Sequence, residues 1–556
     1  MSIVDVSRVE RSALWSAYGD ALGFMTELTD QGGLVHRTGR ERVEDTLPWR
    51  RVIGGRSGAS VLLPAGTISD DTQLRLATSR AIKDGGYFDV EAFAKIELPV
   101  WTSYALGAGR STKAAASNLA RSDINWFSNF FQVEKSDYLN AGGNGPASRI
   151  QPHVWGAPDL EDWKAITANV VKNAICTHGH MRSIVGAVFH ALCLAFALQT
   201  GRAPGPTEWR QIILFQRYVV EAIRADNDLS SFWLPAWEAR TGERVGNAID
   251  RACAELNGGL KAAGDIDGPL SAEEYHGLLR RLDALSEGNR GSGLITPLIA
   301  SVVSYASALD ENFTSPIDTL RMICNALGSD TDTIATMAGA ILGCGVDNEP
   351  QGEIMDRDYI RSEAVRVQTA NRSGIKTTFR YPDLIRWAPP KNGLDALKEA
   401  DGSLVVEGIG KVIFTGEEFH PRGKQQNVYW QWVRLEFGQT LLLKRRRTLS
   451  KAKPEMTRSS EKAKGAPANV EPLPLLRVMQ PPVHEEFEHA RKDEILSLEC
   501  LTTEVIEANF DPTLIGRHLR HLSRAPDGIE RGIAYTSIVM KAMMSRRKRR
   551  REGTDV

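Results

Sequence analysis

The spacing of apolar residues over the first 345 residues constrains the fold most strongly. Between residues 9 and 345, Ala, Leu and Ile recur at intervals of three and four, the period of an α-helix with one buried face. The clearest segments are 11–28, 72–83, 184–198, 209–225 and 332–342. Gly- and Asn-rich turns separate them, with neither a competing strand-like alternation nor a repeat of fixed period. The sequence therefore predicts an all-α domain of many short helices.

The composition changes after about residue 347. Segments 403–415 and 427–437 are rich in β-branched and aromatic residues, and Tyr429, Val433, Leu435 and Phe437 fall on one face at a period of two. Segment 448–475 is rich in Lys, Ser, Pro and Ala, as linkers are. A short helical segment over about 483–522 follows, and the chain closes on the basic run SRRKRRR at 545–551. We therefore predict a small β-containing accessory domain and a helical C-terminal segment.

The length and the charge of the chain limit its domain organisation and its partners further. A chain of 556 residues is too long for one ordinary core, so we expect a helical domain at 1–347, an accessory domain at 348–447, a linker at 448–475 and a helical segment with a basic tail at 476–556. The chain carries 68 basic and 69 acidic side chains, and this balance gives no whole-protein attraction to nucleic acid or membranes. Any such binding has to come from local patches.

The cysteines and the apolar runs indicate a cytoplasmic protein. Six scattered cysteines form no CxxC pair and no metal-like spacing to histidine, which is typical of reduced core thiols. The N-terminus lacks the apolar stretch of a signal peptide. The longest apolar run, 184–198, has 15 residues, short of the roughly 20 that cross a bilayer. We expect this run to form a buried helix, and we expect no membrane partner.

A first acidic cluster lies in YGDALGFMTE, residues 18–27. Asp20 and Glu27 are seven residues apart, about two helical turns, so a continuous helix would turn both carboxylates the same way. Gly19 and Gly23 would let this helix come close to a neighbour or a ligand. The alternative is a surface helix with two solvated acids.

A second cluster lies in GTISDDTQLRLATSRAI, residues 66–82. Ser69 is a plausible N-cap, and Asp70 and Asp71 would occupy the first turn of the helix that it opens. Adjacent carboxylates diverge by about 100° on a helix, so both can reach one centre only at a helix end. Ordinary capping is the alternative.

A third cluster lies in ALGSDTDTIATMAGAILG, residues 326–343. Asp330 and Asp332 alternate around Thr331, so in an extended segment they would point to the same side, with Thr333 leading into a helix. A capping role is again the alternative. Together the second and third clusters supply four carboxylates and two hydroxyls. Oxygen-only ligands of this kind suit Mg²⁺, or Mn²⁺ in its place, and not zinc.

A fourth cluster combines a glycine loop with two histidines. Gly142, Gly143 and Gly145 surround Asn144, so backbone N–H groups could approach a phosphate, which nearby Arg149 could neutralise. His178 and His180 precede a wholly apolar helix. They are not four residues apart, and no Cys or Glu completes a zinc set, so a capping or core role is the alternative for each.

In this order, the clusters resemble the ADP-ribosylglycohydrolase family that includes the dinitrogenase reductase-activating glycohydrolase. The matching motifs are GDALG with Glu27, SDDT at 69–72, GNG at 143–145, HGH at 178–180 and GSDTDT at 328–333. Each motif alone is weak, but five in register over some 325 residues make a strong signal. The resemblance covers residues 9–345 and not the last two hundred.

The resemblance implies an all-α catalytic domain with two Mg²⁺ ions. Ser69, Asp70 and Asp71 would bind metal from one side, and Asp330, Asp332 and Thr333 from the other. Glu27 would be catalytic or gating beside the metals, with Asp71 also in a catalytic role. The residues expected to contact ADP-ribose are Asp20, Gly143, Asn144, Gly145, Arg149 and His178. Ser69 replaces the family's usual threonine and keeps the hydroxyl, whereas Ser148 replaces a frequent methionine in the glycine loop.

The expected reaction is hydrolysis of an N- or O-glycosidic bond to ADP-ribose, which frees an ADP-ribosylated protein or other acceptor. Paired metal ions about 4 Å apart can orient the ribose hydroxyls and a water, from which Glu27 would take a proton. One alternative is a pseudo-enzyme that binds ADP-ribose or a nucleotide without turnover. Another is a nucleic-acid- or complex-binding factor with an ancillary hydrolase domain, suggested by Tyr429, Trp430, Trp432 and the basic tail. We expect the C-terminal third to select the target without performing chemistry.

Overall fold

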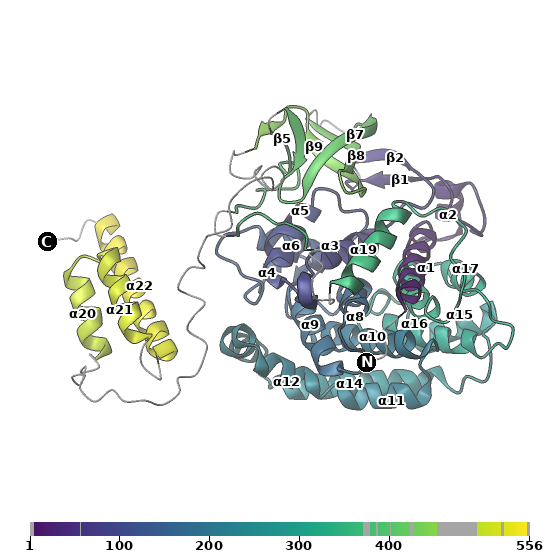
Figure 1. The fold of residues 1–556 in the computed structure, drawn as a ribbon, viewed down its shortest axis with the longest axis horizontal. Helices are drawn as coiled ribbons and strands as arrows, with labels where there is room; N and C mark the ends of the chain where they lie inside the picture. Colours follow the sequence, from purple (N-terminus) through teal and green to yellow (C-terminus); the bar gives the residue numbers. More distant parts are fainter. Residues whose placement is uncertain are drawn as a thin grey trace, which may run out of the picture. The chain divides into compact units, whose positions relative to one another are not determined.

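The computed structural model describes residues 5–55, 57–370, 378–384, 387–400, 402–422, 427–452, 497–523 and 528–552. The chain forms two compact units, residues 1–464 and 465–556, and the elements of each are labelled in Figure 1. Most of the predicted linker and residues 483–496 of the predicted C-terminal helical segment lie outside the described residues.

The first unit is mostly helical up to residue 370. Its helices are α1 (Val6–Phe24), α2 (Gln31–Thr38), α3 (Asp70–Arg80), α4 (Val90–Ala92), α5 (Leu98–Trp101), α6 (Arg110–Leu119), α7 (Gly145–Arg149), α8 (Gln151–Trp155), α9 (Trp163–Ile175), α10 (Met181–Thr200), α11 (Pro206–Phe215), α12 (Tyr218–Ala225), α13 (Leu234–Thr241), α14 (Val245–Ala263), α15 (Ala272–Arg281), α16 (Ile295–Ala308), α17 (Ile317–Cys324), α18 (Thr331–Leu342) and α19 (Arg357–Thr369). Short non-α turns occur at Asp84–Gly86, Phe93–Glu97 and Leu229–Trp233. The predicted helical domain is confirmed in its main feature.

The apolar run at 184–198 lies in α10, a core helix. By length and composition alone α10 could cross a membrane, and no other helix in the described part of the chain could. Its side chains are nearly all buried against α9, α14 and α16. Of the six cysteines, four are buried, Cys253 is partly exposed and Cys500 is exposed, so the expectation of core thiols fails for Cys500.

Helices α1 and α18 pack antiparallel at very short range. A Cβ on Gly19 would lie 2.4 Å from the Ala335 carbonyl oxygen, and a Cβ on Gly23 would lie 2.4 Å from Asp332 Cα. Hydroxyl groups of α1 also bond to the backbone of α18: Ser12 Oγ donates to the Ala340 carbonyl and Ser16 Oγ to the Thr336 carbonyl, each at 2.8 Å. The contact therefore fixes the start of α18 beside the end of α1.

The prediction that no strands interrupt the helices is wrong at residues 49–63. β1 (Trp49–Ile53) and β2 (Ala59–Leu63) form an antiparallel hairpin, with Trp49 paired to Leu63 and Ile53 to Ala59. Inward side chains alternate with exposed ones along each strand, a period of two within a short segment. Gly54 and Gly55 turn the chain with φ of 88° and 79°, a conformation that favours glycine. A second, smaller hairpin joins β3 (Gln132–Val133) to β4 (Ser136–Asp137).

A six-stranded sheet follows the helices and confirms the predicted β-containing region. Its strand order is β10-β5-β6-β7-β8-β9, with β10 parallel to β5 and all other neighbours antiparallel. The strands are β5 (Leu397–Ala400), β6 (Ser403–Val406), β7 (Gly410–Phe419), β8 (Val428–Leu435), β9 (Thr440–Arg446) and β10 (Ser450–Lys451). Tyr429, Trp430 and Trp432 are buried, which corrects the hypothesis that they form an exposed stacking surface.

The sheet and the helices share one core. Arg80 at the end of α3 forms a fully buried ion pair with Glu97 at 2.8 Å, and its Nη1 donates to Gln439 Oε1 at 2.7 Å, in the turn between β8 and β9. The Tyr381 hydroxyl donates to Glu97 at 2.6 Å. Helix α19, which follows residue 347, packs against α1 and α3. Residues on both sides of the predicted boundary at 347 thus build the same hydrophobic core.

The second unit is a small helical bundle of α20 (Leu498–Glu507), α21 (Pro512–Leu522) and α22 (Gly528–Glu552). Its core consists of Leu501, Val505, Leu522, Tyr535 and Val539. The basic run at 545–551 lies within α22. The described residues of the second unit therefore agree with the predicted helical C-terminal segment.

Two buried histidines make stability depend on pH. Burial lowers the pKa of His153 and of His190 to about 3, below the roughly 6.5 of an unfolded chain. As the pH falls below 6.5, the unfolded chain takes up protons that the folded chain cannot, so the free energy of unfolding falls. We expect His190→Gln to remove about 2 kcal/mol of the loss between pH 6.5 and pH 5, measured by urea unfolding. The exposed His36, changed to Gln, serves as the control. Equal pH slopes for His190→Gln and the unaltered protein would contradict the assignment.

Candidate metal centre and active site

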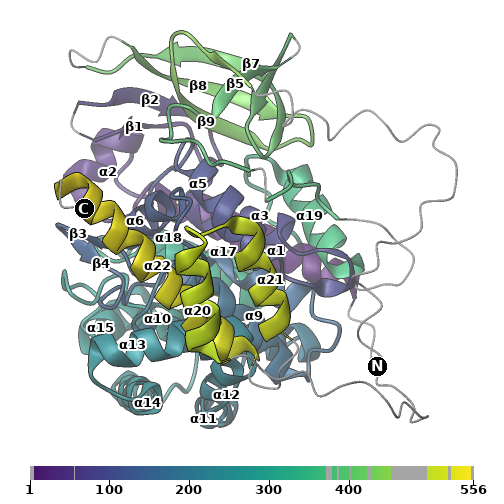
Figure 2. The same ribbon diagram turned by 90° about the vertical axis from the view of Figure 1, so that its left-hand side faces the viewer.

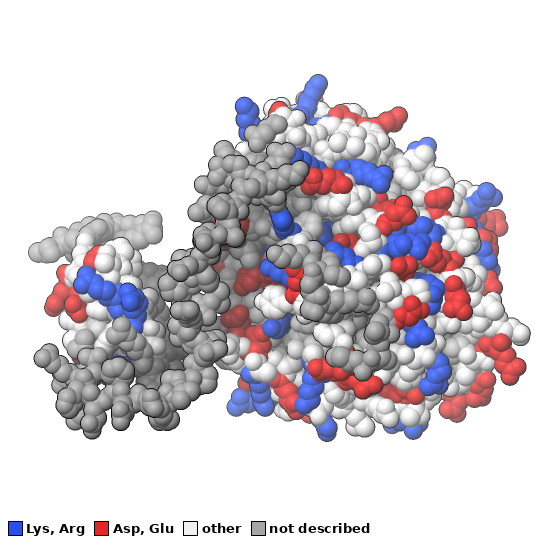
Figure 3. Space-filling view, in the orientation of Figure 1, with Lys and Arg blue, Asp and Glu red and all other residues white. Residues whose placement is uncertain are grey.

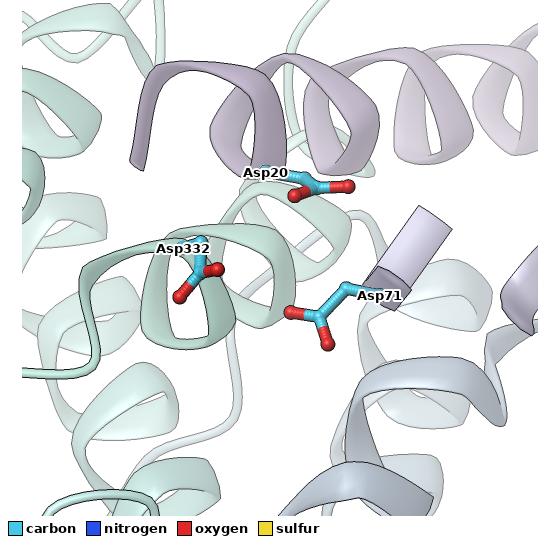
Figure 4. A group of neighbouring side chains, drawn as sticks. All are labelled: Asp20, Asp71 and Asp332. Atoms are coloured by element: carbon cyan, nitrogen blue, oxygen red, sulfur yellow. The ribbon is translucent and has the colours of Figure 1, made fainter. Parts of the chain in front are cut away.

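Three helices bring carboxylates together at one buried point. Asp20 of α1, Asp71 in the first turn of α3 and Asp332 in the first turn of α18 each offer an oxygen within 4.8 Å of the others, and Figure 4 shows their side chains converging. All three are buried. A second group, Glu27, Asp330 and Asp332, meets the same distance limit. The two groups share Asp332, so the second and third sequence clusters converge.

The start of α3 is built as the sequence predicts, with one addition. Ser69 is the N-cap, and its Oγ accepts a hydrogen bond from the Asp71 N–H at 3.1 Å. The carboxylate of Asp20 also caps this helix, accepting from the N–H groups of Ser69 at 3.2 Å and Thr72 at 3.1 Å. Asp20 was expected to contact substrate, but it is fully buried and anchors α1 to the first turn of α3. This anchoring points Asp71 into the cluster.

Asp70 faces a different neighbour from Asp71. Its Oδ1 accepts a hydrogen bond from the Ala108 N–H at 2.6 Å. Gly107, at φ 93°, makes room for it, since a Cβ there would lie 2.5 Å from Asp70 Oδ1. Asp70 belongs to neither three-residue group found among the described residues. It therefore lies beside the cluster, bound to the loop before α6.

The start of α18 differs from the extended segment that the sequence suggested. Asp330 is the N-cap, and the helix already includes Thr331, Asp332 and Thr333. The Thr331 hydroxyl donates to the Gly23 carbonyl at 2.9 Å, which ties α18 to the end of α1. Asp330 and Asp332 still lie together, because a cap and the second helical residue both face the open end of a helix.

Glu27 does not lie on the helix face predicted for it. Helix α1 ends at Phe24, and Glu27 sits in the turn that follows, before Leu28 with φ 47°. Arg37 Nη1 donates to the Glu27 carbonyl at 2.9 Å. The carboxylate forms an ion pair with Arg51 of β1 at 2.9 Å. Glu27 thus reaches the cluster from a loop, while Asp20 reaches it from the helix.

The electrostatics of the cluster favour a bound cation. Burial, and then the neighbouring carboxylates, raise the pKa of Asp71 and Asp332, and that of Asp70 to about 7. Asp71 Oδ2 is buried without a hydrogen-bond partner among the described residues. An all-oxygen, carboxylate-rich donor set with an unpartnered oxygen fits a hard divalent cation such as Mg²⁺.

Arg75 is a cation of the site that the sequence reading missed. It follows Asp71 by one helical turn on α3, and its guanidinium donates to Thr72 at 2.6 Å and to Thr336 at 2.9 Å. Burial lowers its pKa to about 10, so it stays charged at neutral pH beside Asp20 and Asp71. The sequence could have indicated this role, because Arg75 follows Asp71 by four positions and residues four apart lie on the same face of a helix.

The glycine loop adjoins the acid cluster. Asn144 Nδ2 donates to Asp330 Oδ2 at 2.7 Å and to Thr296 at 3.1 Å. Cβ atoms on Gly143 and Gly145 would lie 3.7 and 3.4 Å from the His178 imidazole. The imidazole ring therefore packs directly against the glycine loop. Burial lowers the pKa of His178 to about 3, so its ring is neutral.

The structure shows the contacts of two further residues near this loop, Arg149 and His180. Arg149 is fully buried, and its guanidinium donates to Asn173 at 2.7 Å and to Thr177 at 2.8 Å. These bonds join α7 to the end of α9, while Arg149 Nη1 is buried without a hydrogen-bond partner among the described residues. The phosphate contact expected of Arg149 stays a prediction. His180 is the N-cap of α10, since its Nδ1 accepts from the Arg182 N–H at 3.1 Å, which agrees with the capping role given as the alternative for it.

Residues of the glycine loop help to line an open groove. It has a volume of about 690 Å³, and its lining includes Gly142, Gly143, Gly291 and Ser292. Arg110, Lys135 and Arg182 also line it, together with Glu134 and Asp137. The groove is therefore large enough for a nucleotide-sized molecule and carries both signs of charge.

The fold and site define a mostly helical protein with a buried, carboxylate-rich centre that could hold a metal ion. A family model described as ADP-ribosylglycohydrolase matches residues 3–350, more than half of the sequence, and the chain belongs to that family. The family acts on ADP-ribosylated substrates and is metal-dependent. The chain is also similar to a solved structure titled "ADP-ribosylglycohydrolase-related protein complex", with 17% identity and a TM-score of 0.41 over 66% of this chain and 98% of that one. None of the curated proteins matches it.

Divalent cations should stabilise the folded protein, because they bind its carboxylates and not the unfolded chain. At 100 times the dissociation constant we expect about 2.7 kcal/mol from Mg²⁺ or Mn²⁺, measured as a rise in Tm. Asp332→Asn should remove this response. It should also raise the Tm of the metal-free protein by a few °C, because one repelling charge is gone. Asp265→Asn, at an exposed position, is the control. An undiminished metal response in Asp332→Asn would exclude Asp332 as the shared ligand.

Proposed function

We propose that this chain is a magnesium-dependent hydrolase that cleaves the glycosidic bond between ADP-ribose and an acceptor. The observation that carries the proposal is that two clusters of three acidic side chains share Asp332 and lie next to Asn144 of the glycine loop. The chain that carries them belongs to the ADP-ribosylglycohydrolase family. Asp71 would hold ions from one side, and Asp330 and Asp332 from the other. The family resemblance adds Ser69, Asp70 and Thr333 as ligands; Asp70 would have to bind through Oδ2, because its Oδ1 accepts from the Ala108 N–H. The bound ions would orient the ribose hydroxyls and lower the pKa of a water.

The protein groups have separate tasks in the proposed reaction. Glu27 takes a proton from the attacking water, whose oxygen bonds to the anomeric carbon as the bond to the acceptor nitrogen or oxygen breaks. The acceptor leaves with a proton. Gly143 and Gly145, with the neutral His178 beside them, bind the diphosphate side through backbone N–H groups. The Asn144 N–H donates to the Gly291 carbonyl at 3.0 Å, so Asn144 contributes by holding the loop in place. Burial around Asp71 and Asp332 excludes bulk water and strengthens each charge interaction.

The acceptor is proposed only as a class, an N- or O-linked group on a protein or another molecule. The groove beside the glycine loop suits the ADP portion, because Arg110, Lys135 and Arg182 carry the charge that a diphosphate attracts. The idea of nucleic-acid binding by the accessory sheet loses its main support, since Trp430 and Trp432 are buried. On the face in Figure 3, positive and negative side chains of the first unit are also interspersed.

The direct test is release of ADP-ribose from substrates modified at arginine, at serine and on nucleic acid. We expect release from at least one of them in Mg²⁺ or Mn²⁺, and loss of that release after EDTA treatment, because the carboxylates need cations to bind and orient substrate. Chromatography of free ADP-ribose measures it. Full activity after exhaustive chelation would refute the metal mechanism, while binding without release would favour the pseudo-enzyme alternative.

Glu27→Gln should separate chemistry from binding. We expect the rate to fall by about 10²-fold or more, the usual size for a lost general base, while ADP-ribose affinity stays near that of the unaltered protein. Rates come from single-turnover release and affinity from calorimetry. Glu41→Gln, an exposed acid in a nearby loop, is the matched control. Loss of ADP-ribose binding in Glu27→Gln would show that Glu27 is structural or a metal ligand.

A further inference from the structure

The β1–β2 hairpin carries a cation to Glu27. Arg51 Nη2 lies 2.9 Å from Glu27 Oε2, and the two side chains are only 21% and 17% exposed. The Arg51 guanidinium also lies 4.2 Å from the centre of the Phe24 ring and 5.7 Å from that of Trp49. Phe24 and Trp49 pack edge to face, so the aromatic pair holds the guanidinium in one place.

The ion pair decides where the Glu27 carboxylate points. Glu27 lies beyond the end of α1, so no helix fixes its side chain. Its oxygens lie close to Asp330 and Asp332, whose negative charges would drive a free carboxylate away. Arg51 is the cation that forms a direct ion pair with it, and it offsets this repulsion at short range. Arg37 and Lys113 also lie near enough to interact with the Glu27 charge, but the structure shows no ion pair between either of them and Glu27 among the described residues.

The hairpin is in turn held by the accessory sheet. The Trp430 ring of β8 lies directly on Gly54, where a Cβ would be 2.4 Å from Trp430 Cζ2. The Arg422 N–H donates to the Gly58 carbonyl at 3.0 Å, which joins the segment after β7 to the hairpin turn. Figures 1 and 2 show β1 and β2 beside the sheet in both views. A chain of contacts thus runs from Trp430 through the hairpin to Arg51 and Glu27.

We propose that Arg51 is the positioning residue of Glu27, and that the accessory sheet sets the place of Arg51 through the contact of Trp430 with Gly54. The accessory sheet is then part of the active-site machinery, in contrast to the expectation that the C-terminal third only selects the target. This inference rests on the proposed function for its effect on rate. Its structural half, the order of the Glu27 turn, stands independently of that function.

Arg51→Gln tests the positioning role through a split between rate and binding. We expect kcat to fall 10- to 100-fold, since a displacement of about 1 Å in a catalytic group has this effect, while ADP-ribose affinity and KM change less than threefold. Arg51→Lys keeps the charge and should recover part of kcat. Arg51 Nη1 is buried with no acceptor among the described residues, so a direct substrate contact is the competing role. A raised KM with unchanged kcat would establish that contact and overturn the proposal, as would an unaltered kcat and KM.

Two adjacent glycines provide a matched test of the sheet contact. Gly54 and Gly55 both have positive φ, so alanine costs similar backbone strain at each. A Cβ at Gly54 would collide with Trp430, whereas one at Gly55 would meet nothing within 4 Å. We expect Gly54→Ala to lower kcat several-fold and Gly55→Ala to leave it unchanged, with both full-length proteins folded by circular dichroism. Equal effects of the two changes would overturn the role of the sheet.

Hydrogen exchange separates this inference from the proposed function. Measured without substrate, backbone amide exchange in residues 25–30 should accelerate in Arg51→Gln and Gly54→Ala but not in Gly55→Ala. The reason is that the first two changes remove or displace the Arg51 side chain that pairs with Glu27. If no substrate releases ADP-ribose but exchange changes as expected, the proposed function fails and the positioning contact stands. Unchanged exchange in Arg51→Gln and Gly54→Ala would overturn the inference, whatever the activity.

Discussion

Gly19 and Gly23 let α1 lie so close to α18 that side chains larger than hydrogen would strike the backbone of Ala335 and Asp332. This close packing places Asp20 and Asp332 within reach of each other, and Asp20 then caps α3 and points Asp71 into the same space. The hydroxyl groups of Ser12, Ser16 and Thr331 fix the register of the two helices. The acid cluster is therefore a consequence of how two helix backbones pack, and α3 is positioned by the cluster itself.

That arrangement costs stability in the absence of a cation. Burial and mutual repulsion disfavour the charged forms of Asp71 and Asp332, which is why the pKa of each carboxyl is raised. Arg75 offsets part of the repulsion near Asp20 and Asp71, and Arg51 offsets part near Glu27. The unpartnered Asp71 Oδ2 still leaves a buried acceptor without a donor in the described structure. Such unfavourable charge is typical of functional sites, because the bound ligand supplies the missing interaction.

The accessory sheet is joined to the helices of the carboxylate cluster by buried polar contacts as well as by apolar packing. Arg80, at the far end of α3 from Asp71, pairs with Glu97 and donates to Gln439 beside the sheet. Glu97 also accepts from Tyr381. A buried ion pair left without one partner is strongly destabilising, so these contacts keep the sheet against α3. Both ends of the helix that carries Asp71 are thus fixed by residues distant in sequence.

Local hydrogen bonding and helical periodicity could be read from the sequence alone. They predicted most helices, the N-cap at Ser69 and the place of Asp71 in a first helical turn, because capping and helical spacing involve residues within four positions of one another. The order of the motifs that matches the family could also be read from the sequence. Tertiary structure decided what depends on distant segments. It placed Glu27 in a turn against Arg51, turned Arg149 into the core, buried Trp430 and Trp432, and made a hairpin of residues 49–63. A side chain's burial and charge partner come from whichever segments pack on it, and those segments here lie up to several hundred residues away.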